Sequence, residues 1–237
     1  MEQSIQQSAP LIRERLKTPR AAAIAGILFS ILLSTTLVLL RISAPAASQE
    51  IPAWLAGGAD TVVLALNLVP FTGIAFLWFI GVVRDRVGAY EDRFFASVFL
   101  GSGLLFLAMF FSAAAVAGAT LIALKTEPKT MLESGAYAFG RTITAQVMNV
   151  YALRMAGVFM ISTATIAIRT HILPRWITLP GYALASLLLV SSHFFDWLGL
   201  AFPLWVLILS VYILVENLRP RRPDAAAKPE REGYRPQ

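Results

Sequence analysis

The sequence predicts an all-α membrane protein, a polytopic bundle of six transmembrane helices with both termini in the cytoplasm. Three observations support this class. Hydrophobic residues make up 57% of the 237 residues and charged residues only 14%, whereas soluble domains average about 25% charged residues. Several apolar stretches reach the roughly 20 residues that a membrane-spanning helix needs. The basic residues cluster beside the ends of these stretches, as topology signals do in membrane proteins.

The chain begins with a polar segment, residues 1–20, that carries four basic residues ahead of the first apolar run at 21–40. A secretory signal peptide cleaved near 44–47 is the alternative interpretation. Its apolar region would be only about 7–15 residues long. Because the run is longer than that, the sequence favours an uncleaved first span and a cytoplasmic N-terminal segment.

The apolar stretches divide the region 21–217 into six spans joined by polar connections. The predicted spans are 21–40, 61–83, 94–124, 142–168, 176–192 and 198–215. The piece IPAWLAGG ahead of the second span is expected to form a short interfacial helix, with Trp54 at headgroup level. The third span would be roughly 46 Å long as a helix, well over a hydrocarbon core of about 30 Å, so it must tilt, protrude or break.

The connection 125–141 is predicted to carry a helix that Pro128 opens and that continues into the fourth span. Spans three and four would then form a hairpin that stands out of the membrane. The small residues of the run 112–119, SAAAVAGA, allow a neighbouring helix to approach closely. That neighbour can belong to the same chain or to a second copy in a homo-oligomer.

The C-terminal segment 218–237 is charged, rich in proline and poor in large apolar residues, and it is predicted to be disordered. Its first basic residues follow the last span directly and are expected to contact anionic lipid headgroups. These residues are Arg219, Arg221 and Arg222.

The distribution of basic residues predicts the orientation. With six spans, fifteen of the 20 lysines and arginines lie on the side of the two termini and four on the opposite side. Loops rich in Lys and Arg stay in the cytoplasm. The sequence therefore predicts a multi-pass protein of the cell (inner) membrane with both ends cytoplasmic, and the lipid bilayer as its first partner.

One cation, Arg154, lies near the middle of the fourth predicted span, where a charge needs a partner, water or a function. At about 100° per residue, Tyr151, Ser162 and Thr165 fall on the same broad stripe of that helix, and Thr144 and Gln146 join them. Such a polar stripe is expected to face the interior of the bundle. Asn67, beside Pro70 on the second span, is the other deep polar side chain and the expected neighbour of Arg154.

Two interpretations of Arg154 remain open. In the first, its side chain snorkels or donates to backbone carbonyls freed by Pro70 and to Asn67, and so holds helices together. In the second, the stripe lines a cavity, and the planar fork of the guanidinium binds an anionic or carboxylate-bearing ligand. No Asp or Glu lies within the core of a predicted span, which argues against a proton relay through carboxylates.

Other chemistry has little support in the sequence. There are no cysteines, which excludes disulfides and thiolate metal sites. His171 and His193 lie at opposite ends of the fifth span, about 30 Å apart, so no shared metal site is predicted. His193 and Asp196 could form an acid–base pair at the outer surface, or could anchor the interface together with their aromatic neighbours. No cofactor motif and no nucleic-acid partner is predicted.

The leading functional interpretation is therefore a structural, assembly or sensor subunit of a bacterial cell membrane. The alternative is a small-molecule or anion carrier in which Arg154 lines a central cavity. An intramembrane hydrolase that uses His193 and Asp196 is the third. No enzymatic activity is favoured.

Overall fold

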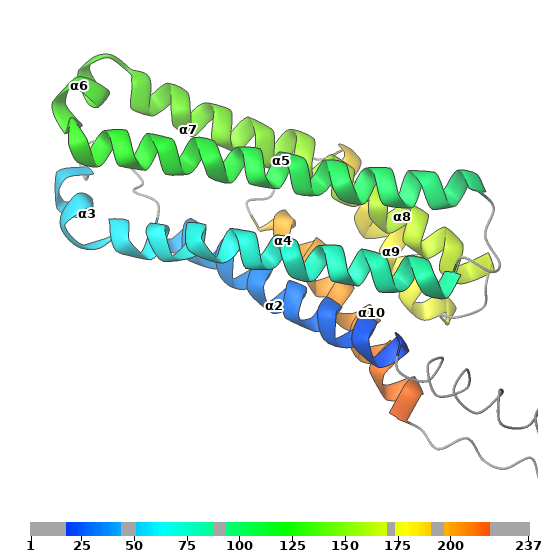
Figure 1. Ribbon diagram of the computed structural model, residues 1–237. Coiled ribbons are helices and arrows are strands. Elements are labelled where there is room, and N and C mark those ends of the chain that lie inside the picture. Colours follow the sequence, from blue (N-terminus) through cyan, green and yellow to red (C-terminus); the bar gives the residue numbers. More distant parts are fainter. Residues whose placement is uncertain (1–17, 44–50, 88–92, 170–173, 191–196, 219–237) are drawn as a thin grey trace, which may run out of the picture.

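The computed structural model describes residues 18–43, 51–87, 93–169, 174–190 and 197–218. The described chain is helical and contains no strand, which confirms the all-α part of the prediction (Figure 1). The long helices are α2 (Thr18–Ser43), α4 (Ala59–Val87), α5 (Arg93–Thr126), α8 (Leu153–Arg169), α9 (Arg175–Val190) and α10 (Ala201–Leu218). The shorter ones are α3 (Ile51–Gly57), α6 (Pro128–Glu133), α7 (Ala136–Gln146), the π-helix η2 (Val147–Ala152) and the 3-10 turn η3 (Leu198–Leu200).

Five of the described helical segments are long and apolar enough to cross a membrane. They are Ala23–Ser43, Ala59–Arg84, Phe94–Thr126, Ala136–Arg169 and Leu198–Glu216. They coincide with predicted spans one to four and six, and they support a multi-pass membrane protein. The fifth predicted span corresponds to α9, a shorter apolar helix of 16 residues that measures about 24 Å.

The predicted hairpin of spans three and four is present, with one difference. Pro128 opens α6, where its missing N–H costs nothing. That helix does not continue into the fourth span, because Gly135 adopts a left-handed φ of 73° and turns the chain before α7. From Ala136 to Arg169 the helix is then continuous through α7, η2 and α8.

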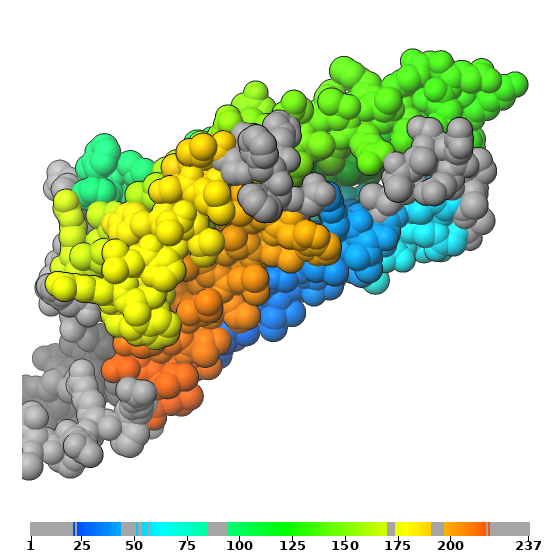
Figure 2. All heavy atoms as spheres, turned by 180° about the vertical axis from the view of Figure 1, so that it is seen from behind, coloured from blue at the N-terminus to red at the C-terminus, as the bar shows by residue number. Residues whose placement is uncertain are grey.

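Neighbouring helices run antiparallel, as contacts along their length show. Gly181 and Trp176 of α9 lie beside Trp205 and Tyr212 of α10, respectively, so residue numbers rise in one helix as they fall in the other. Between α2 and α10, Gly26 faces Ser210. The start of α2 and the end of α10 consequently lie at the same end of the bundle (Figure 1). Seen from behind, α2, α10 and α9 lie side by side (Figure 2).

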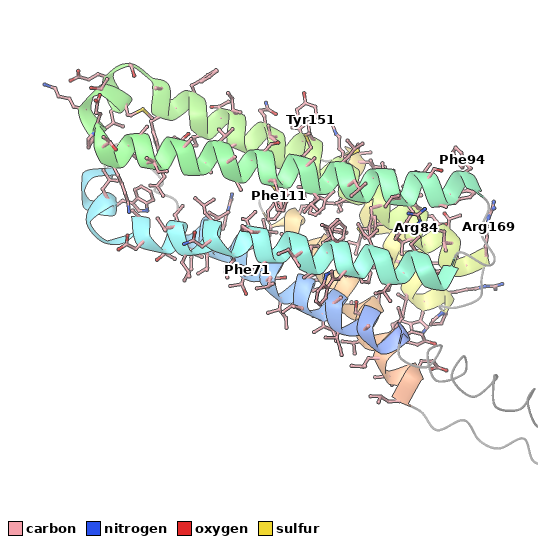
Figure 3. The ribbon with its side chains drawn as sticks, in the orientation of Figure 1. Phe71, Arg84, Phe94, Phe111, Tyr151 and Arg169 are labelled. Carbon is pink, nitrogen blue, oxygen red and sulfur yellow. The ribbon has the colours of Figure 1, made fainter. Side chains whose placement is uncertain are left out.

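The same end of the bundle carries described arginines. Figure 3 shows Arg84 and Arg169 there, with Phe94 at the start of α5. The Arg169 guanidinium lies 4.4 Å from the ring centroid of Phe95, which joins the end of α8 to the start of α5 by a cation–π contact. At the opposite end, Lys125 Nζ and Asp60 Oδ1 form an ion pair of 3.2 Å between α5 and α4.

A cluster of phenylalanine rings fills the centre of the bundle and joins its helices. Phe76 of α4 is fully buried and contacts five other rings, at centroid distances from 4.5 to 6.4 Å. These rings are Phe29 of α2, Phe79 of α4, Phe106 of α5, Phe159 of α8 and Phe202 of α10. Most of the pairs are tilted or edge-to-face, the arrangement that aromatic quadrupoles favour. The packed rings leave the middle of the bundle apolar.

Close contacts between backbones hold the second half of the bundle together. A Cβ atom at Gly157 of α8 would lie 3.0 Å from the carbonyl oxygen of Ala185 and 3.2 Å from Leu189 on α9. A side chain at this position would require the neighbouring atoms of α9 to move by a few tenths of an ångström. In the hairpin, Gly140 of α7 lies directly against Thr120 of α5. These close approaches lie outside the predicted run 112–119. Within that run, a Cβ atom at Gly118 would meet only Leu66, at an ordinary distance of 3.8 Å, so the predicted close approach is not seen there.

Candidate functional site

The helix that carries Arg154 changes its winding just before that residue. Between α7 and α8, residues Val147–Ala152 form a π-helix, and the N–H of Leu153 donates to the carbonyl of Met148. This bond spans five residues instead of the four of an α-helix. A π-segment holds one extra residue compared with an α-helix of the same rise. The residues that follow it are therefore rotated about the helix axis, relative to their positions in a continuous α-helix.

This shift explains where the predicted polar stripe fails. Gly140 packs inward against Thr120, and twelve residues further on Ala152 is fully buried, followed by Ala156. In an uninterrupted α-helix, position 151 would lie on the same face as Gly140, since 11 residues make about three turns. Tyr151 is instead 57% exposed, and Figure 3 shows it pointing away from α4. Arg154 is half-buried on α8.

Two hydroxyl residues of the predicted stripe, Ser162 and Thr165, lie further along α8 and serve packing. Ser162 is buried, and its Oγ donates to the carbonyl of Val158. Thr165 Oγ1 donates to the carbonyl of Ile161 and also lies 2.6 Å from the hydroxyl of Tyr182 on α9. The Thr165–Tyr182 pair is a polar link between α8 and α9. Sequence reasoning missed Tyr182, because nothing in the sequence shows which face of α9 meets α8.

Asn67 is not brought next to Arg154. Asn67 is exposed on α4, and its neighbour Leu66 lies opposite Gly118 of α5. Phe159 of α8 lies opposite Gly103, which is also on α5. With about 1.5 Å of rise per residue, these contacts place Asn67 and Arg154 at levels about 15 Å apart along α5.

The depth of Arg154 follows from its place on α8. It lies about 22 Å along the helix from Arg169, at about 1.5 Å per residue. Its neighbour Leu153 packs near Gly199, in the turn that starts the α10 segment. Trp197, just before that turn, is exposed. Arg154 therefore lies at the level where the α9–α10 hairpin ends, and not at the level of the central phenylalanines.

Several predicted site residues cannot be placed. His171, His193, Asp196 and the arginines predicted to contact lipid, Arg219, Arg221 and Arg222, lie outside the described residues.

No protein-family model matches the chain, and no curated protein and no solved structure matches it significantly. The geometry of the bundle is therefore the basis for assigning a function.

Proposed function

We propose that the chain crosses the inner membrane six times, with both termini in the cytoplasm. The antiparallel course of neighbouring helices and the common end of α2 and α10 support an even number of crossings. The excess of basic residues at that end supports its cytoplasmic location. At about 24 Å, α9 is short for a core of about 30 Å, and a bilayer adapts to a short helix by local thinning.

Within this arrangement, we propose that the protein is a structural, assembly or sensor subunit that presents a helical hairpin on the outer side of the membrane. The observation that carries this proposal is the extent of α5 and α7. In Figures 1 and 2, the α10 segment ends near the middle of the long helices, while α5, α6 and α7 extend beyond it, with α3 and the start of α4 beside them. Leu153 lies at the level of the start of the α10 segment, and the continuous helix of η2 and α7 extends about 25 Å from Leu153 to Ala136.

The hairpin has a surface that suits a protein partner. α7 packs chiefly on α5 and leaves its remaining sides exposed. Phe139 is 68% exposed on α7, and Ile122 is similarly exposed on α5. Because Gly140 lies against Thr120, these two apolar side chains are at the same level of the hairpin. Exposed aromatic and aliphatic side chains surrounded by polar residues are characteristic of binding surfaces.

The anion-carrier alternative has less support. A carrier binds its substrate near the bilayer midplane. Here the middle of the bundle is filled by Phe76 and the rings around it. Arg154 lies at the start of α8, away from these rings. The hydrolase alternative depends on His193 and Asp196, which lie outside the described residues, so it stays a prediction.

Site-specific photo-crosslinking in intact cells tests the proposed role. A benzophenone amino acid in place of Phe139 is expected to give one adduct of discrete mass, because this ring faces the partner. The matched control is the same substitution at Phe71, which is 61% exposed on the lipid-facing side of α4 and should give no protein adduct. An adduct at twice the mass of the chain identifies a second copy as the partner. Absence of a protein adduct at both positions contradicts the proposal.

A further inference from the structure

We propose that Arg154 and Tyr151 bind the phosphate of a phospholipid headgroup in the outer leaflet. The inference rests on the proposed orientation of the bundle, but not on the partner of the hairpin. It assigns to Arg154 a lipid ligand at the membrane surface instead of a transported solute in a central cavity.

The first argument is depth. In the proposed orientation, basic Arg169 at the end of α8 lies at the cytoplasmic boundary of the membrane, and Arg154 lies about 22 Å from it. A hydrocarbon core of about 30 Å puts Arg154 within one or two helical turns of the outer interface. Trp197, exposed at the same end of the α9–α10 hairpin, fits the belt of Trp and Tyr residues found at headgroup level. A long arginine side chain at this depth reaches the phosphates by snorkelling.

The second argument is the direction of the side chains. The π-segment turns Tyr151 outward, so that its ring is 57% exposed. Arg154 follows three residues later on the same helix, and residues at this spacing are neighbours on a helix surface. The half-buried Arg154 side chain and the exposed Tyr151 side chain can therefore contact the same lipid molecule.

The third argument is chemistry. A guanidinium has five N–H donors in a planar fork that matches a phosphate group, and it keeps donors for a lipid while it also contacts the protein. The Tyr151 hydroxyl adds a sixth donor. Around this site the side chains of Gln146 and Asn149 are also exposed. The described residues of η2 and the first turn of α8 include no Asp or Glu that would repel a phosphate.

Native mass spectrometry of the purified full-length protein tests the inference by counting retained phospholipid molecules. Arg154→Gln is expected to lower the occupancy of one bound phospholipid about tenfold, since the charge-assisted hydrogen bonds to the phosphate are lost. Arg154→Lys should lose less, because the charge remains. Tyr151→Phe, a mild change at an exposed ring, should reduce occupancy in the same direction. Arg141→Gln removes an exposed arginine from the outer hairpin and should leave occupancy unchanged.

Two results would overturn the inference. Retention of the same phospholipid by Arg154→Gln and Tyr151→Phe would show that these side chains only pack within the protein. Displacement of the lipid by millimolar inorganic phosphate would identify a site for a soluble anion. Neither result alters the crosslinking outcome at Phe139, so failure here is distinguishable from failure of the proposed function.

Discussion

Phe76→Ala is expected to lower the stability of the protein more than any other single truncation of the aromatic cluster. Phe76 is fully buried and contacts rings from all four other helices of the cluster, α2, α5, α8 and α10, besides Phe79 of its own helix. In soluble cores such a truncation costs about 3–5 kcal/mol. Because lipid is as apolar as the protein core, the truncation mainly removes packing contacts. We therefore expect the free energy of unfolding in a membrane to fall by about 1–3 kcal/mol.

The matched control is Phe71→Ala on the same helix. Phe71 is 61% exposed, so its truncation removes contacts with lipid and leaves the bundle intact. The measurement is reversible unfolding of both variants in mixed micelles, followed by intrinsic tryptophan fluorescence, to which the buried Trp205 contributes. Equal free energies of unfolding for the two variants would show that the aromatic cluster does not hold the helices together.

Deletion of Asn149 is expected to leave the fold intact, which is unusual for a deletion inside a membrane helix. The residue is exposed within the π-segment Val147–Ala152. Removing one residue there restores an ordinary α-helix and places Ala152 11 residues after Gly140, about three full turns. Both halves of the helix then keep their contacts, Gly140 with Thr120 and Ala156 with the core. We expect a change of less than about 1 kcal/mol.

Deletion of Ile161 in the middle of α8 is the contrasting variant. It rotates the preceding residues Leu153–Met160 by about 100°, which takes the fully buried Phe159 out of the aromatic cluster. The cost should exceed the roughly 1–3 kcal/mol expected for Phe76→Ala, because several buried side chains are displaced at once. It should be visible as loss of the protein from membranes or a large fall in its thermal midpoint. If the two deletions destabilise the protein equally, the π-segment is not the extra residue that we take it to be.

The sequence was sufficient for the helices but not for the details that place the site. Long apolar runs identify spans because a lipid-exposed backbone has to satisfy its own hydrogen bonds. Pro128 correctly marks the start of α6, since proline suits the first turn of a helix. The π-segment has no such signal. Its residues, VMNVYA, suit an α-helix equally well, and the extra residue is accommodated only because both α7 and α8 pack against α5.

The extra residue of the π-segment changes which face of the helix Tyr151 occupies in the candidate site. A constant 100° per residue puts Tyr151 on the inner face with Thr144, whereas the structure exposes it. The contact between Thr165 and Tyr182 could not be predicted from the sequence either, because it depends on how α8 and α9 are rotated about their axes. Periodicity within one helix predicts which residues share a face, but the neighbour of that face is decided by tertiary packing.

The central claim, six crossings with both termini in the cytoplasm, is tested most directly by labelling single cysteines in intact cells. The chain contains no cysteine, so Ser4→Cys, Ser134→Cys and Ala226→Cys each report on one position without background. A membrane-impermeant maleimide should label position 134, in the outer hairpin, and should reach positions 4 and 226 only after the membrane is permeabilised. Labelling of either terminal position in intact cells would contradict six crossings with cytoplasmic ends.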